Sequence, residues 1–216
     1  MTTVDTRAVV DLLGVLAYAE LTAFDRLAED ARMAPTLAGR AALARMAAAE
    51  MGHHDRLAQR LTELGADPTE AMSPFVAALD GFHEGTRPRT WLEGLVKAYV
   101  GDGLAADFYR EIAGFLAEPD RSLILEVLAD TGHADFAVRE VRAAIAAQRT
   151  LAGRLALWGR RLVGEAISQS QAVIAERDGL ARLIMGGTGD LTGVVRLQDR
   201  ITAAHTERMK ALGLNP

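Results

Sequence analysis

The feature that most constrains the fold of this chain is a carboxylate and histidine pair that occurs twice in helix-forming sequence. The first copy is Glu50-Met51-Gly52-His53, and the second, 80 residues later, is Asp130-Thr131-Gly132-His133. A spacing of three residues brings both side chains of a pair onto one face of a helix, where a carboxylate and an imidazole can bind the same metal ion. The repeat therefore predicts two related half-sites.

The apolar pattern of the first half places the first pair on a buried helix face. Residues 6 to 31 and 37 to 64 carry apolar residues at the three-four spacing of amphipathic helices. Glu50 lies seven residues after Leu43 and His53 lies four residues before Leu57, so both share the apolar stripe of the second helix. Glu20 lies within the stripe of the first helix. These polar side chains are thus predicted to face the core.

The second half repeats this plan after a proline-containing connection, residues 65 to 89. A capping box at Thr90-Trp91-Leu92-Glu93 opens a third helix that contains Asp102. A fourth helix is predicted to begin near Asp120 and to contain both Asp130 and His133. Two further helices, residues 149 to 178 and 190 to 212, are expected on either side of a glycine-rich turn at 186 to 189.

A helix pair, a crossover and a second helix pair are the plan of a ferritin-like four-helix bundle. We therefore predict an all-α chain with one ferritin-like domain over residues 1–216. Residues 1–147 would form the four-helix core, with its crossover at 65–89. Residues 148–216 would add two packing helices.

The internal repeat defines a candidate ligand set for two metal ions. Asp102 follows Glu20 by 82 residues, close to the 80 that separate the two carboxylate and histidine pairs. Four buried carboxylates require neutralisation, because each uncompensated buried ion costs several kcal/mol. Protons in a polar core are one solution, and two divalent ions such as iron, manganese or zinc are the other. The predicted metal ligands are Glu20, Glu50, His53, Asp102, Asp130 and His133.

Composition narrows the function classes. The net charge of -5 argues against a general nucleic-acid coat or a membrane-surface protein. The absence of cysteine excludes disulfides and cysteine-ligated iron-sulfur clusters, and fits the reducing cytoplasm where we expect the protein. No signal peptide or membrane-spanning segment is expected. Residues 139 to 161 contain six arginines and a single acidic residue, Glu140. These arginines form either a phosphate-binding face or a solvated helix face.

The order of the six predicted ligands is similar to that of ferritin-like di-iron carboxylate proteins. The segments Ala98-Tyr99-Val100-Gly101-Asp102-Gly103 and Asp107-Phe108-Tyr109-Arg110-Glu111 resemble an actinobacterial branch of that superfamily, which is grouped with the MiaE-type tRNA hydroxylases. The resemblance implies two iron ions, with manganese as the alternative, and oxygen-dependent hydroxylation. The family at large has Glu where this chain has Asp102 and Asp130. Because the Asp side chain is one methylene shorter than that of Glu, the sequence is compatible with either one or two bound metal ions.

Two functions follow as expectations. The first is a hydroxylase that uses dioxygen, takes electrons from a separate reductase, and acts on tRNA or on a small organic substrate. The second is a ferritin-like iron-binding protein or ferroxidase without hydroxylase activity. A homodimer is the expected assembly.

Overall fold

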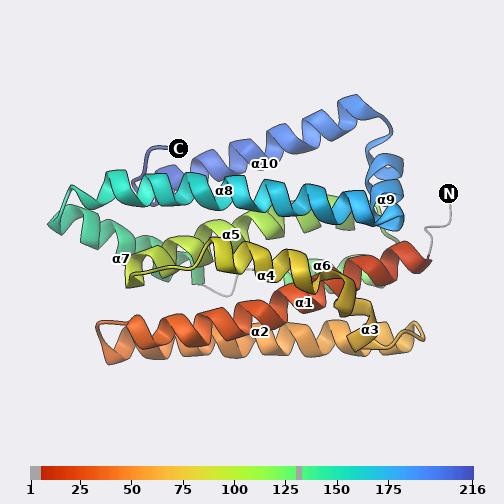
Figure 1. Ribbon diagram of the computed structural model, residues 1–216, viewed down its shortest axis with the longest axis horizontal. Helices are drawn as coiled ribbons and strands as arrows, with labels where there is room; N and C mark the ends of the chain where they lie inside the picture. The colour runs from red at the N-terminus through yellow and green to blue at the C-terminus, as the bar shows by residue number, and fades with distance from the viewer. Residues whose placement is uncertain (1–5, 130–132) are drawn as a thin grey trace.

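Long helices joined by short connections make up the described residues, 6–129 and 133–216, of the computed structural model (Figure 1). The side chains of His133, Ala175 and Leu191 are not described. No β-strand occurs in these two ranges, which confirms the all-α prediction. The α-helices are α1 (Thr6–Asp30), α2 (Leu37–Glu63), α3 (Pro68–Met72), α4 (Val76–Gly85), α5 (Trp91–Ala113), α6 (Asp120–Val127), α7 (His133–Ala147), α8 (Leu151–Glu176), α9 (Asp178–Thr188) and α10 (Leu191–Ala211).

Local signals set several helix boundaries where the sequence places them. Thr36 caps α2 by accepting a hydrogen bond from the Gly39 amide at 3.0 Å, and Thr90 caps α5 by accepting one from the Glu93 amide at 3.2 Å. Gly65, with a φ of 79°, ends α2 in a conformation that disfavours other residues. These caps explain why predicted and observed ends agree closely.

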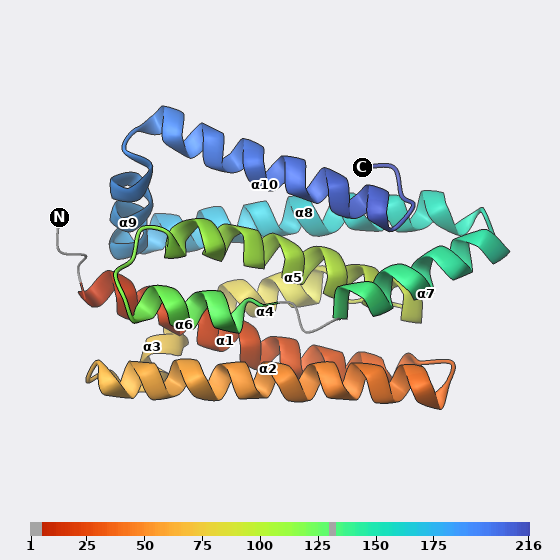
Figure 2. The ribbon, with the colours of Figure 1, turned by 180° about the vertical axis from the view of Figure 1, so that it is seen from behind.

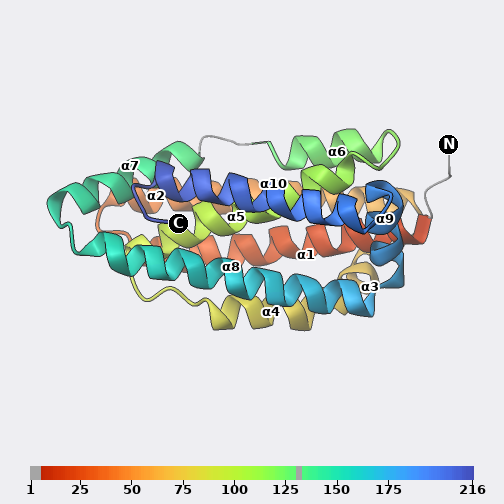
Figure 3. The ribbon, with the colours of Figure 1, turned by 90° about the horizontal axis from the view of Figure 1, so that it is seen from above.

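The topology is that of the predicted bundle with a crossover. α1 and α2 form an antiparallel hairpin, and α5 runs in the same direction as α2 after the connection folds back along the bundle as α3 and α4 (Figures 1 and 2). A 3₁₀ turn, Ser73–Phe75, lies between α3 and α4. α8 and α10 lie along the side of α5 opposite α1 and α2, so α5 is central (Figures 1 and 2), and in the view from above α5 lies beneath α8 and α10 (Figure 3).

The fourth helix differs from the prediction. It is two helices, α6 and α7, because α6 ends at Val127 and α7 begins at His133. The Leu128 carbonyl, which a continuous helix would use internally, accepts a hydrogen bond from Arg110 at 2.6 Å. Periodicity alone did not reveal this interruption.

The C-terminal region differs as well. Instead of two helices it has three, because residues 178–188, which include three of the four residues of the expected glycine-rich turn, form the short helix α9. The chain turns at Gly189, which has a φ of 82°. No described helix is sufficiently long and apolar to cross a bilayer.

Two hydrophobic clusters fill the interior, one toward each end of the bundle. The first joins residues such as Leu13, Leu57 and Ile112, and the second joins residues such as Leu43, Val100 and Leu162; these six are at most 1% exposed. Along α1 and α2 the polar residues of the predicted site lie between the parts of each helix that enter the two clusters. The core is thus divided at mid-length by a polar layer.

The crossing of α1 over α3 depends on Gly14, because a Cβ there would overlap the backbone carbonyl of Ala71. We expect Gly14→Ala to destabilise the chain by about 1–3 kcal/mol, since α3 would have to shift. Gly52→Ala is the matched control: nothing lies within 4 Å of its Cβ position, and alanine should stabilise α2 by about 0.5–1 kcal/mol. Urea unfolding of both variants provides the measurement. A Gly14→Ala variant as stable as the parent would contradict the close approach.

Candidate metal centre

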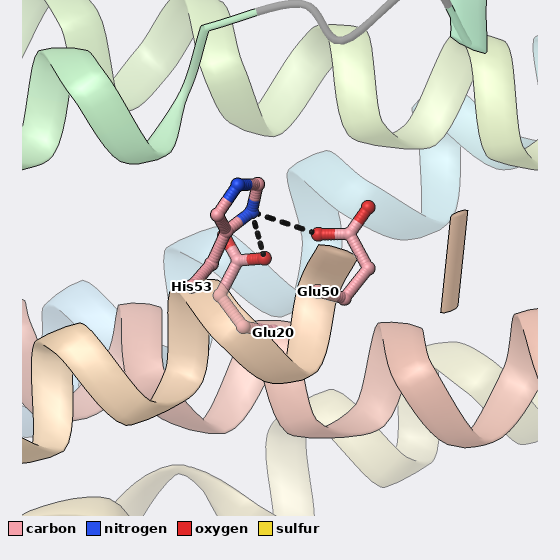
Figure 4. A group of neighbouring side chains, drawn as sticks. All are labelled: Glu20, Glu50 and His53. Atoms are coloured by element: carbon pink, nitrogen blue, oxygen red, sulfur yellow. Dashed lines mark hydrogen bonds and ion pairs between the residues drawn. The ribbon is translucent and has the colours of Figure 1, made fainter. Parts of the chain in front are cut away.

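Three of the predicted ligands converge in the polar layer. Glu20 comes from α1, while Glu50 and His53 come from adjacent turns of α2 (Figure 4). Their ligand atoms all lie within 4.8 Å of one another. The Nδ1 atom of His53 lies 3.2 Å from Oε2 of Glu50 and 3.4 Å from Oε2 of Glu20. Two carboxylates and an imidazole at this spacing can coordinate a single divalent metal ion.

The group is shielded from water. The side chains of Glu20, Glu50 and His53 are 12%, 13% and 17% exposed. Burial, and secondarily the nearby Glu50 carboxylate, raise the pKa of Glu20 to about 9. Hydrogen bonds with Glu20 and then Glu50 raise the pKa of His53 to about 9. Near pH 7 the metal-free site therefore retains protons, which a bound cation would displace.

A cavity of about 350 Å³ adjoins this group. Its wall is mostly apolar. The lining residues, such as Leu16, Leu95 and Ala137, come mainly from α1, α2, α5, α6, α7 and α10. Glu20, Glu50 and His53 all line it. The volume lies within the range of about 300–1,000 Å³ that small-molecule sites occupy. The site can therefore present a bound metal to an organic molecule.

Asp102 lines the same cavity from α5 but stands outside the group of three. Its side chain keeps accessible surface because it faces the cavity, although the surrounding protein removes most of its hydration. This desolvation and the charge of Glu50 raise the pKa of Asp102 well above its usual range. Asp107, another acidic residue of α5, forms an ion pair with Arg208 at 2.6 Å. Of the two, Asp102 is the one that faces the cavity.

The other predicted half-site is only partly visible. Asp130 lies outside the described residues, and the side chain of His133 is not described, so their contribution to a metal site remains a prediction. The backbone of His133 opens α7, and the neighbouring Ala134 and Ala137 line the cavity. Four of the six predicted ligands are therefore placed at or beside one cavity.

Arg208 is a cavity residue that the sequence did not indicate. It lies on α10, about 100 residues from its ion-pair partner Asp107, so no local pattern connects the two. It passes so close to Gly103 that a Cβ at that position would lie 2.6 Å from its Cδ atom. Arg208 thus places a positive charge at the cavity wall beside Gly103, the residue that follows Asp102 in the chain.

Comparison with known proteins identifies the family. A family model described as "Ferritin-like domain, actinomycetes" matches residues 4–187. The chain belongs to this actinomycete ferritin-like family. A solved structure, described as protein 19 with aldehyde deformylating oxidase activity from Synechococcus, superimposes with a TM-score of 0.73 and 18% sequence identity. The alignment covers 98% of this family member and 94% of that chain, which confirms the ferritin-like fold. No curated protein sequence matches this chain.

Proposed function

We propose that this ferritin-like protein is a di-iron, oxygen-dependent oxidase or hydroxylase that acts on a small apolar molecule. The supporting observation is the mostly apolar cavity beside Glu20, Glu50 and His53, because a protein that only stored or oxidised iron would not need space for an organic molecule there. We infer that these three residues and Asp102, together with Asp130 and His133, would hold the metals. Bound iron would supply the activation of dioxygen.

The residues of the chain would divide the remaining tasks. Glu20, Glu50 and His53 would hold positive charge within a shielded layer, and the apolar wall would orient the substrate and exclude water. Insertion of one oxygen atom while the other leaves as water requires two electrons. We expect a separate reductase to deliver them, because the chain has no cysteine-bound cluster and no dinucleotide fingerprint.

A small substrate is favoured over tRNA for a structural reason. Two arginines of the candidate phosphate-binding face are engaged by the end of the chain itself. Arg142 donates to the carbonyl of Ala211 at 3.0 Å, and Arg160 donates to that of Asn215 at 3.1 Å. MiaE-type activity on tRNA is therefore a weaker proposal than oxidation of an apolar alcohol, aldehyde or hydrocarbon. The aldehyde deformylating oxidase activity of the similar solved structure makes aldehydes the first panel of compounds to test.

Oxygen consumption distinguishes the proposed enzyme from the alternative iron-binding protein. We expect the Fe(II)-loaded chain with a chemical reductant to consume oxygen several-fold faster when an apolar aldehyde or hydrocarbon is present, with formation of an oxidised product. Oxygen uptake that follows Fe(II) alone and is unaffected by every organic compound in the panel would favour a ferroxidase. The Glu50→Ala variant provides the background rate in both cases.

A further inference from the structure

A second cavity, of about 270 Å³, lies between the end of α1, α4 and α5 and shares no lining residue with the metal centre. Its wall contains four cationic and two anionic side chains, which gives an excess of two positive charges. These charged residues are Arg26, Arg32, Arg87, Lys97, Glu29 and Asp30. A cavity of this size holds several water molecules or one small ligand. Its charge favours an anion over water alone.

Lys97 is the most unusual residue of this wall. It is 6% exposed, and its Nζ atom has no hydrogen-bond partner among the described residues. Its Nζ atom lies 5.4 Å from the centroid of the Phe82 ring, so the contact that it makes there is a cation–π contact. A buried ammonium group without hydrogen bonds is strongly unfavourable, because it has lost its hydration without gaining a partner. A bound anion would supply that partner.

The two carboxylates of the wall do not fill this role. Glu29 is already shared by two arginines: Arg87 lies 2.7 Å from its Oε1 atom and Arg26 lies 3.2 Å from its Oε2 atom. Asp30 is 8% exposed and makes no hydrogen bond with Lys97. Burial raises the pKa of Asp30 to about 6, so Asp30 is mainly ionised at pH 7 and attracts Lys97 through space, but it leaves the donors of the ammonium group without a hydrogen bond. The Nε atom of Arg26 is also buried without a partner among the described residues.

His83 adds an acceptor to these donors. The Thr22 hydroxyl donates its hydrogen to the Ala19 carbonyl at 2.9 Å, so its oxygen accepts from Nε2 of His83 at 3.2 Å. This contact places the proton of His83 on Nε2 and leaves Nδ1 as an acceptor, since burial lowers the pKa of His83 to about 3 and keeps the ring neutral. Nδ1 is buried and has no partner in the described chain. A ligand with an O–H group would satisfy it.

We propose that this cavity binds a small oxyanion that retains an O–H group, such as monohydrogen phosphate, with Lys97 and Arg26 as donors and His83 as acceptor. The Lys97 amine lies within the wall, and its flexible four-carbon stem allows it to turn into the cavity. The proposal is independent of the proposed oxidation chemistry, because Lys97 does not line the metal centre.

The test is phosphate binding by the metal-free full-length chain, so that phosphate cannot ligate iron. We expect isothermal titration calorimetry at pH 7 and constant ionic strength to show one phosphate per chain, and the melting temperature to rise with phosphate concentration. Sulfate, which lacks an O–H group at this pH, should bind at least tenfold more weakly. The Lys97→Met variant should weaken phosphate binding at least tenfold while folding normally, since it removes a buried unpaired charge and keeps the apolar stem.

Lys210→Met is the matched control, because Lys210 is 59% exposed on α10 and pairs with Glu207 far from this cavity along the chain. It should bind phosphate like the parent, as should the metal-site variant Glu50→Ala. Equal phosphate affinity in the parent and Lys97→Met, or no phosphate binding by the parent, would overturn the proposal. Equal affinity for sulfate and phosphate would overturn the role assigned to His83.

Discussion

Replacing Glu50 with alanine should abolish tight iron binding. The parent chain, loaded anaerobically with Fe(II) and desalted, is expected to retain two iron ions, whereas Glu50→Ala should bind Fe(II) at least about 100-fold more weakly. The physical reason is the central position of Glu50, whose carboxylate lies 3.2 Å from His53 in a layer shielded from water. Without it, a cation would lose a charged ligand that water in this layer cannot replace. Metal analysis and equilibrium competition with a chelator provide the measurements.

Two further variants make this result interpretable. Glu63→Ala removes a carboxylate from the exposed end of α2, where its side chain is 49% exposed, and should leave the iron content unchanged. His133→Ala tests the half-site that lies beyond the described side chains, and a drop from two iron ions to one would assign it to the second metal. Retention of two iron ions by Glu50→Ala would exclude the metal centre proposed here.

Metal binding should also stabilise the fold, and more strongly as the pH rises. At free metal concentrations about 1,000-fold above the dissociation constant, the gain is about 4 kcal/mol, or roughly 10 °C in melting temperature for a chain of this length. Below pH 9 the metal must displace protons from Glu20 and His53, whose pKa values are both raised to about 9. The increase in melting temperature on metal binding should therefore be larger at pH 8 than at pH 6.5.

The metal-free chain should show the opposite trend. Glu20 and His53 hold more protons in the folded chain than in the unfolded chain over this interval, so their contribution to stability declines as the pH rises from 6.5 to 8. Burial lowers the pKa of Lys97 to about 8, so the destabilising effect of its buried charge starts to diminish near pH 8 and partly opposes this trend at the upper end of the interval. Glu20→Gln should flatten the trend and remove most of the metal response. Thermal unfolding with and without metal at both pH values is the measurement, and a metal response independent of pH would argue against proton displacement.

The sequence by itself determined the long helices α1, α2 and α5 and the polar character of the layer between the two hydrophobic clusters. Apolar spacing and caps such as Thr36 and Thr90 are local, because each depends on residues within a few turns of one helix. For the same reason, the placement of Glu20, Glu50 and His53 on buried stripes could be predicted, and the structure brings these three side chains together. The ferritin-like topology followed from two helix pairs and one long connection.

Only the tertiary structure decided which distant surfaces meet. The division of the fourth helix depends on Arg110 reaching the Leu128 carbonyl, and the position of Asp102 outside the group of three depends on how α5 packs against α1 and α2. The burial of Lys97 beside Asp30 and His83 likewise joins three helices that are separated by long stretches of chain. A local pattern can place a charged residue on one face of a helix, but it does not show which distant side chains meet it there. Its environment, and hence its protonation and binding chemistry, is set by the packing of segments far apart in the sequence.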